Sequence, residues 1–239
     1  MKTNNYSKKS AFTLAETLIA MAIIGIVAVM TIPALLVSKE KTENMTRLKK
    51  AYTSFNQALT KLTDDYGCAG NLECTGLIKV DKGVALGDEL TKRLKVSKNC
   101  GIDAAQHCFS KSVNGAYNGK GANVSYDSDY RFTTLDSIAF RFHSYETWNA
   151  PSTGNLARAC GIVMIDVNGP DVGPNYYGRD VFWFYLANGK GALLYPVGGP
   201  DDDVTLAWPT SDKTCTNSNA NAQNCAGRIM QESWTINYY

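Results

Sequence analysis

An apolar stretch close to the N-terminus constrains this chain more than any other part of its sequence. Residues 17–37 contain no charged side chain. These 21 residues are enough to cross a hydrocarbon core about 30 Å thick, at about 1.5 Å per helical residue. A single carboxylate, Glu16, lies at the head of the stretch. Because an ionisable group beside or inside a span costs at least ~2.5 kcal/mol, Glu16 indicates a functional site and needs a partner.

The first eleven residues of the chain form a basic leader with three lysines and no acidic side chain. Positive charge beside a span stays on the cytoplasmic side, so we expect the chain beyond the span to be exported. Cleavage between Ala11 and Phe12 would expose a new amino group four residues before Glu16. A cation is poorly placed at a helix start, because the helix dipole is also positive there. We therefore expect Glu16 of the same or a neighbouring subunit to neutralise this amine and to act in assembly.

This segment resembles the N-terminus of type IV pilins and type II secretion pseudopilins. The matching residues are the small Ala11 at the cut, the Phe12-Thr13-Leu14 start, Glu16 as fifth residue of the mature chain, the Ile23-Ile24-Gly25-Ile26 core, and Pro33. The family usually has glycine at the position of Ala11. The resemblance implies that a prepilin peptidase cleaves before Phe12 and methylates it, after which the helices pack into a filament core. The alternatives are an uncleaved signal anchor and a conventional signal peptide, but no small-x-small site closes the apolar run.

Two residues inside the stretch interrupt the uniform pattern of an apolar helix. Pro33 removes a backbone hydrogen bond and clashes with the preceding turn, which predicts a kink or local melting near residues 30–33. Gly25 marks a point where another helix can approach closely. In a filament the two residues would let the helix bend and its neighbours pack, although both are also commonly tolerated in spans.

Beyond the span, residues 38–66 change to a charged helix with a regular apolar stripe. The stripe residues recur at alternating spacings of three and four, as on a helix with one buried face: Met45, Leu48, Tyr52, Phe55, Leu59, Leu62 and Tyr66. We expect this face to pack on the chain's own sheet rather than on a coiled-coil partner. Together with the span it predicts one helix over residues 12–66, which is 55 residues and about 80 Å long.

After residue 66 the sequence becomes rich in Gly, Asn, Asp and Cys, with short apolar runs between turn signals. The pattern predicts a short helix over residues 86–94, strands over residues 138–142, 160–167, 181–187 and 192–197, and a final strand or extended tail over residues 229–239. Strands that follow one long helix indicate an α+β fold with a mostly antiparallel sheet. This agrees with the pilin fold, in which the half-buried N-terminal helix lies across a meander of strands.

The chain therefore divides into four predicted parts: a leader peptide (residues 1–11), a membrane-spanning assembly helix (12–37), an amphipathic helix that continues into the head (38–66) and an extracytoplasmic globular head (67–239). With 239 residues, 44% hydrophobic and 19% charged, the chain is large and apolar enough to bury its own core. Removal of the three leader lysines changes the side-chain charge from +2 to 21 − 22 = −1. Phosphate binding needs a concentrated cationic patch, so nucleic acid is not expected as the main ligand.

Seven cysteines lie beyond the membrane segment, and export would place them in an oxidising compartment. Pairing of sequence neighbours would close three short loops: Cys68 with Cys74, Cys100 with Cys108, and Cys215 with Cys225. Sequence alone does not fix the connectivity, and the odd cysteine either keeps its thiol or pairs between chains. We expect the odd one to be Cys160, because it opens an apolar run in which a buried thiol behaves as a small hydrophobic group.

A polar segment at the end of the predicted strand 160–167 has the spacing of the beginning of a calcium loop. Asp166, Asn168 and Asp171 place side-chain oxygens around a turn-forming Gly169. The bidentate Glu that ends an EF-hand loop is missing, and Asn-Gly is also the strongest short hairpin signal. A calcium site and a simple tight turn therefore both fit this segment. A second acidic run, Asp201-Asp202-Asp203, is expected to be a solvated loop.

The sequence contains none of the common catalytic motifs, since G-x-S-x-G, HExxH and the P-loop are all missing. We therefore expect no enzyme and, apart from calcium, no cofactor. Two hypotheses from different classes remain. The first is a structural subunit of a type IV pilus or type II secretion pseudopilus. The second is a minor tip pilin or adhesin whose head binds a substrate, DNA or a host surface.

The resemblance also implies where the protein acts and with which partners. The expected partners are prepilin peptidase, other pilin or pseudopilin subunits, the inner-membrane assembly machinery and membrane lipid. The expected location is the bacterial inner membrane, with the N-terminus in the cytoplasm and the head outside, and then a pilus or periplasmic pseudopilus.

Overall fold

The computed structural model describes residues 13–79, 81–125, 129–144, 159–188, 193–199, 215–217 and 221–239. The chain divides into two compact units, Met1–Glu40 and Lys41–Tyr239. Helix α1 (Leu14–Asp65) begins in the first unit and continues into the second. The expected cleavage position, Ala11 and Phe12, lies outside the described residues.

Helix α1 is helical over all of its 52 residues, including the turn around Pro33. Of the two outcomes predicted near residues 30–33, local melting is therefore wrong, and a kink stays a prediction. Proline removes one backbone donor from the helical ladder. Here the turns on both sides of Pro33 stay helical, so the loss of that single bond does not interrupt the helix.

The predicted apolar stripe is the face of α1 that packs on the sheet of the second unit. Its buried members are Met45, Leu48, Phe55, Leu59 and Leu62. Phe55 stacks on Phe140 of the sheet, with ring centroids 5.1 Å apart. Tyr66 is 43% exposed, because α1 ends one residue before it. Apart from Tyr66, the prediction that this face packs on the chain's own sheet is confirmed.

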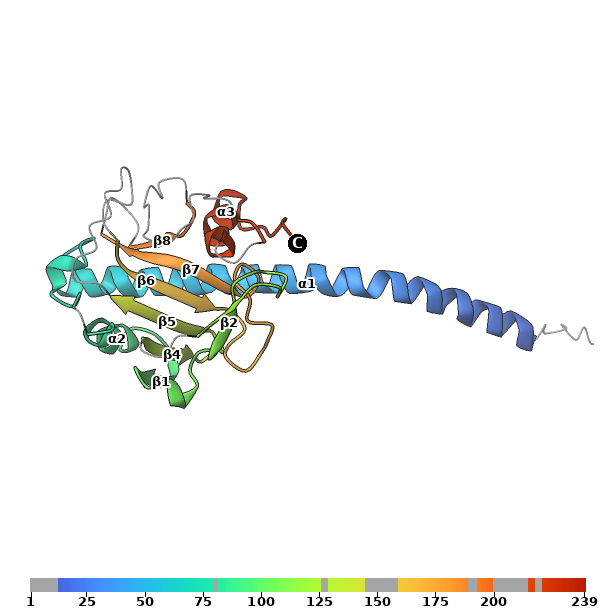
Figure 1. The fold of residues 1–239 in the computed structure, drawn as a ribbon, viewed down its shortest axis with the longest axis horizontal. Coiled ribbons are helices and arrows are strands. Elements are labelled where there is room, and N and C mark those ends of the chain that lie inside the picture. Colours follow the sequence, from blue (N-terminus) through green and yellow to red (C-terminus); the bar gives the residue numbers. More distant parts are fainter. Residues whose placement is uncertain are drawn as a thin grey trace, which may run out of the picture. The chain divides into compact units, whose positions relative to one another are not determined.

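The second unit is built on a six-stranded antiparallel sheet with the strand order β1-β4-β5-β6-β7-β8 (Figure 1). The strands are β1 (Val96–Gly101), β4 (Tyr130–Thr134), β5 (Ala139–Ser144), β6 (Ala159–Asp166), β7 (Val181–Ala187) and β8 (Leu194–Pro196). From β4 to β8 each strand pairs with the next in the sequence, so this part is a meander. A separate hairpin pairs β2 (Ser112–Asn114) with β3 (Asn123–Ser125).

The four strands predicted from the sequence are all present, with ends shifted by at most two residues. Two further strands of the sheet, β1 and β4, were not predicted. On β4 the buried Arg131 interrupts the apolar pattern that indicates a strand. On β1, which forms an edge of the sheet, three of the six residues are polar and exposed, namely Ser97, Lys98 and Asn99.

Short helices complete the second unit. They are η1 (Glu73–Thr75), α2 (Val84–Thr91), η2 (Ala104–Gln106), η3 (Asn221–Asn224) and α3 (Cys225–Gln231). Helix α2 overlaps the helix predicted over residues 86–94 but ends three residues earlier.

Helix α3 corrects the strand predicted at the C-terminus, because residues 229–231 are helical. The helix packs beside β7 and β8 (Figure 1). Gly227 makes this possible, since a Cβ at its position would lie 2.1 Å from the carbonyl carbon of Gly198. The N–H of Gly227 donates to the carbonyl of Val197 at 2.9 Å. Close backbone packing, which hydrophobic periodicity does not reveal, therefore selects the helix here.

The last two residues of the chain pack against other residues of the second unit. The Tyr238 hydroxyl donates to the carbonyl of Gly178. The Tyr238 ring also lies 5.1 Å from that of Tyr117. The amine of Lys41 on α1 lies 4.5 Å from the centre of the Tyr239 ring. Residues 235–239 form neither a helix nor a strand, and contacts at both of the last two residues hold them in place.

Candidate functional site

Thr13 and Glu16 exchange hydrogen bonds at the start of α1. The carboxylate oxygen Oε2 of Glu16 accepts from the backbone N–H and from the hydroxyl of Thr13, both at 2.8 Å. In return, the Thr13 hydroxyl accepts from the N–H of Glu16 at 3.3 Å. This is a capping box, with Thr13 as the N-cap and Glu16 as the third helical residue. The T-x-x-E spacing in the sequence is the signal that could have revealed this second role of Glu16.

The capping box fixes the Glu16 carboxylate close to the place where processing would create a charge. Thr13 directly follows Phe12 in the sequence, so an amino group created at Phe12 is one residue away from the N-cap. A carboxylate held in place at a helix start is a good partner for such a cation, because it offsets the repulsion between the amine and the helix dipole.

The first half of α1 exposes apolar side chains on all sides. All residues from 14 to 37 are exposed except Ala28, which is half-buried. Leu14 and Met30, near the two ends, are 77% and 74% exposed. By length and composition α1 is able to cross a membrane. Soluble proteins rarely expose a continuous apolar surface of this size, so lipid or other helices are needed to cover it.

Gly25 leaves a gap in this apolar surface. Apart from the neighbouring backbone of its own helix, no heavy atom of the described residues lies within 4 Å of the position that a Cβ on Gly25 would occupy. Within the part of the chain that the structure describes, no other segment packs on Gly25. Its backbone is accessible to a helix of another molecule, which is how small residues act where helices meet in membranes. Pro33 lies in the same exposed part of the helix.

Three disulfide bonds close short loops in the second unit. They join Cys68 to Cys74, Cys100 to Cys108 and Cys215 to Cys225, which are the pairs of sequence neighbours. The seventh cysteine, Cys160 on β6, keeps its thiol and is 2% exposed. This thiol donates to the carbonyl of Leu186 at 3.4 Å.

The predicted calcium residues lie in two different environments. Asp166 ends β6 and is fully buried. The amide of Asn168 donates to the carboxylate of Asp180 at 3.1 Å. Asp171, in contrast, is exposed, and its carboxylate lies 3.0 Å from Nε2 of His107. The loop therefore brings Asp166 and Asn168 next to Asp180 and leaves Asp171 apart.

Asp166 and Asp180 form a buried acidic pair, with both side chains fully inaccessible to solvent. Burial, together with the charge of Asp180, raises the pKa of Asp166 well above its ordinary value. Burial raises the pKa of Asp180 to about 6. The N–H groups of Tyr176 and Asn175 donate to Asp180 at 2.6 and 2.8 Å and partly oppose this rise. The pair is thus costly to keep charged.

The residues that the structure describes do not gather three or more His, Cys, Asp or Glu side chains into a group that could hold a metal ion. Near the acidic pair, the buried Oδ1 of Asn168 accepts no hydrogen bond from the described residues. Calcium binding at this loop stays a prediction.

Both histidines have acidic partners, His107 within the loops and His143 on strand β5. His107 lies beside Asp171, and His143 lies beside Asp129, with Nδ1 to Oδ1 at 2.9 Å. The Arg141 guanidinium also donates to Asp129. Cys108, which follows His107 in the sequence, is bonded to Cys100 and is not available as a nucleophile.

Comparison with protein families matches residues 6–32 to the prokaryotic N-terminal methylation motif. This range includes the expected cleavage position, both residues of the capping box, and Gly25. No characterised protein and no solved structure matches the chain. The family match therefore covers the start of the chain and does not extend into the second unit.

Proposed function

Because this chain carries the prepilin-type methylation motif of the type IV pilin and pseudopilin family, we propose that it is a structural subunit of a type IV pilus or a type II secretion pseudopilus. A long apolar helix followed by an antiparallel sheet with disulfides gives it a pilin-like α+β fold. Pilins are typically structural proteins, and we propose no enzymatic activity for this one.

The exposed apolar half of α1 carries the proposal. An uncharged helix surface that the described part of its own chain does not cover needs a second environment. Before assembly, lipid of the inner membrane covers the surface as the helix spans the bilayer. In the filament, the corresponding helices of neighbouring subunits replace the lipid. One surface thus serves as anchor and as assembly interface.

Processing links the two states. Prepilin peptidase would cleave between Ala11 and Phe12 and methylate the new amino group. That cation would be buried among apolar helices in the filament, where an unpaired charge is strongly unfavourable. We propose that Glu16, already fixed by Thr13, neutralises the amine of Phe12 in the same or a neighbouring subunit.

The proposed topology places the basic leader in the cytoplasm and the second unit outside, following the positive-inside rule. The three disulfide bonds support this placement, because such bonds persist in an oxidising compartment. The inner-membrane assembly machinery would then draw the processed subunit out of the bilayer.

The test compares native membranes with sheared fibres from the same cells. N-terminal peptide analysis of the mature protein should find N-methyl-Phe12, and the protein should be abundant in the fibres. A retained Met1, or a cut beyond residue 30, would refute the proposal. Presence in fibres only as a trace would instead favour a minor tip pilin or adhesin.

A further inference from the structure

Four half-buried tyrosines gather beside the residue at which α1 enters the second unit. They come from three segments that are far apart in the sequence and are here named the aromatic collar: Tyr117, Tyr176, Tyr238 and Tyr239. The rings of Tyr117, Tyr238 and Tyr239 form a cluster, with centroids 5.1 to 5.8 Å apart. Lys41, the first residue of the second unit, places its amine 4.5 Å from the centre of the Tyr239 ring. The collar therefore adjoins the first turn of α1 in this unit.

Three cations lie over the rings of the collar. The amine of Lys41 is one of them, and the guanidinium groups of Arg179 and Arg228 lie 5.3 to 6.0 Å from ring centres. A cation that rests on an aromatic ring keeps its charge and still attracts anions. Arg228 also pairs with Glu232 at 2.8 Å, so its charge is partly offset.

The length of the uncharged stretch sets the depth of Lys41 in a bilayer. The 21 residues from 17 to 37 form about 32 Å of helix, which matches a hydrocarbon core about 30 Å thick. Helix α1 continues from Leu14 to Asp65 without a break. Lys41 follows Val37 by four residues and is therefore about 6 Å outside the core. The headgroup layer on each side of the core is about 5 to 8 Å thick, so Lys41 lies at the level of the headgroups.

The residues that contact the first turn of α1 in this unit lie close to the same level. The Tyr239 ring is beneath the amine of Lys41, and Asn44 donates to the carbonyl of Arg179 at 3.0 Å. Tyrosine is enriched at this level of membrane proteins, because its ring is apolar and its hydroxyl is polar. Lysine and arginine are suited to the same layer, since both bind phosphate groups.

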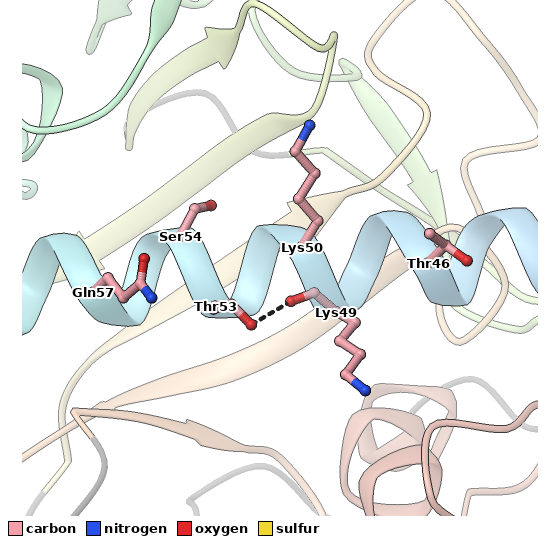
Figure 2. A pocket seen from close by; sticks show the side chains of 6 residues that line it. All are labelled: Thr46, Lys49, Lys50, Thr53, Ser54 and Gln57. Carbon is pink, nitrogen blue, oxygen red and sulfur yellow. Dashed lines mark hydrogen bonds between the residues drawn. The ribbon is translucent and has the colours of Figure 1, made fainter.

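The solvent side of α1 beyond the collar has a different composition. A shallow hollow follows it there, and the described residues that line the hollow are all polar: Thr46, Lys49, Lys50, Thr53, Ser54 and Gln57 (Figure 2). They follow Lys41 by 5 to 16 residues, which is about 8 to 24 Å further from the hydrocarbon core. The surface thus changes from rings and cations beside Lys41 to side chains that prefer water, as expected where a helix leaves a bilayer.

We propose that the aromatic collar, together with Lys41 and Arg179, binds the phospholipid headgroups on the side of the membrane that carries the second unit. The proposal rests on one part of the proposed function, the single span with the second unit outside. The rings pack against the apolar part of the headgroup layer, and the two cations contact phosphates. The contact holds the second unit on the bilayer before assembly, and it breaks when the subunit is drawn into a filament.

Photo-cross-linking tests the collar in the full chain, reconstituted in vesicles of phosphatidylethanolamine and phosphatidylglycerol. Tyr239→benzoylphenylalanine keeps an aromatic ring in the collar and makes it reactive to light. Irradiation should add the mass of one phospholipid to the peptide that contains residue 239. The positive control is Leu36→benzoylphenylalanine, within the span. The matched negative control is Tyr66→benzoylphenylalanine, because Tyr66 is 43% exposed and follows the end of α1, about 36 Å beyond Lys41.

Lipid adducts at positions 36 and 239, without one at position 66, support the proposal. An adduct at position 36 alone would overturn it, because the rings then serve only to pack the tail within the second unit. Adducts at all three positions would also overturn it, because lipid would then contact the second unit without preference for the collar.

The two cations are tested in the background of the Tyr239 cross-linker. Lys41→Gln combined with Arg179→Gln should lower the yield of lipid adduct about fivefold or more, since each cation near a membrane surface adds attraction to the headgroups. The matched control, Lys49→Gln with Lys61→Gln, removes two exposed lysines further along α1 and should keep the yield. Equal yields from the two pairs would overturn the assignment of Lys41 and Arg179 to phosphate binding. Recovery of the three disulfide bonds shows that each variant is folded.

The outcome for the collar is separate from the outcome for the proposed function. The vesicles contain neither prepilin peptidase nor assembly machinery, so the adduct reports on lipid contact alone. Native protein that yields N-methyl-Phe12 and fibres, together with vesicles that yield no adduct at position 239, would overturn the collar and keep the function. An adduct from a chain that is never processed or assembled would do the reverse.

Discussion

Thr13 and Glu16 hold each other in place across the first turn of α1, with hydrogen bonds of 2.8 and 3.3 Å. Both bonds that the carboxylate accepts end on the same oxygen, Oε2. This leaves Oε1 of Glu16 for a second partner. Glu16, which stands out for its charge, therefore also belongs to the capping box of its own helix, and the two roles can be separated by substitution.

The first prediction separates the charge of Glu16 from its capping bond. Glu16→Gln keeps an acceptor for Thr13, because Gln also completes a capping box. Glu16→Ala removes both the acceptor and the charge. If the charge neutralises a buried amine, both variants lose several kcal/mol per subunit, by the penalty for breaking a buried pair. Both should be cleaved and folded but absent from sheared fibres.

The third variant of this series is Thr13→Val, which removes the hydroxyl of the cap and keeps the charge. Loss of an N-cap costs about 1 kcal/mol, so assembly should fall only modestly. Fibre yield is compared with the membrane pool of cleaved subunit. Assembly of Glu16→Gln at the wild-type level would show that capping alone explains the carboxylate.

The second prediction concerns the gap at Gly25. Gly25→Leu should leave cleavage and the folding of the second unit unchanged, because no other segment among the described residues lies within 4 Å of the Cβ position. Fibre yield should fall several-fold if another helix packs against this backbone. Ala20→Leu adds similar bulk to another exposed position of the same segment and serves as control. Equal effects of the two substitutions would argue against a specific contact at Gly25.

The third prediction concerns the disulfide bonds in the native protein. Non-reducing peptide mapping should recover the links Cys68–Cys74, Cys100–Cys108 and Cys215–Cys225. Each closes a short loop and is expected to stabilise the fold by about 2 kcal/mol. The buried thiol of Cys160 should react with an alkylating reagent only after unfolding. A peptide that links Cys160 to another cysteine would contradict the assignment.

The fourth prediction is a loss of stability as the pH rises from about 4 to about 6. Burial raises the pKa of Asp180 from 3.8 to about 6, so the folded protein binds this proton more tightly than the unfolded chain. The stabilisation from the proton is fully present below pH 3.8 and is lost as the pH rises through about 6. The shift corresponds to roughly 3 kcal/mol. Asp166 acts in the same direction.

The measurement is the free energy of unfolding of the full chain in detergent and a chelator, between about pH 4 and pH 7. Asp180→Asn should remove most of the slope. Asp171→Asn, at a carboxylate with an 83% exposed side chain, should keep it. Equal slopes for all three proteins would show that the buried pair does not bind the proton.

The fifth prediction tests calcium at the same loop. Calcium held by Asp166 would offset the charge of the acidic pair at pH 7.5 and raise the midpoint of thermal unfolding at about 1 mM calcium. Asp166→Asn should abolish this shift. Asp171→Asn should keep it, because Asp171 faces His107 instead. A wild-type midpoint that does not change with calcium would remove the calcium hypothesis.

Hydrophobic patterning predicted the parts of the fold that bury continuous apolar surface. The stripe on α1 and the runs that became β5 to β8 are examples, and β7 has the predicted ends. The pattern fails where an interaction other than apolar burial determines the local structure. Arg131 is buried within β4, and the backbone contact of Gly227 selects the helix α3 over an extended tail.

The acidic loop shows why site residues are harder to predict than strands. Asp171 lies five residues after Asp166 in the sequence, whereas Asp180 lies 14 residues after Asp166. The antiparallel register pairs Asp166 with Val181, and this pairing brings Asp180 alongside. Register depends on how the whole hairpin closes. The spacing of side chains along the sequence could therefore not show that Asp180, rather than Asp171, lies beside Asp166.

The packing of the last two residues limits how this protein can be labelled. Tyr238 is bonded to Gly178, and Tyr239 lies beneath the amine of Lys41. A fluorescent or epitope tag fused after Tyr239 would disturb both of these contacts. A small tag inserted at the exposed Gly67, just beyond the end of α1 that is remote from Lys41, would leave them untouched. Imaging of live filaments would therefore start from the internal insertion rather than from a C-terminal fusion.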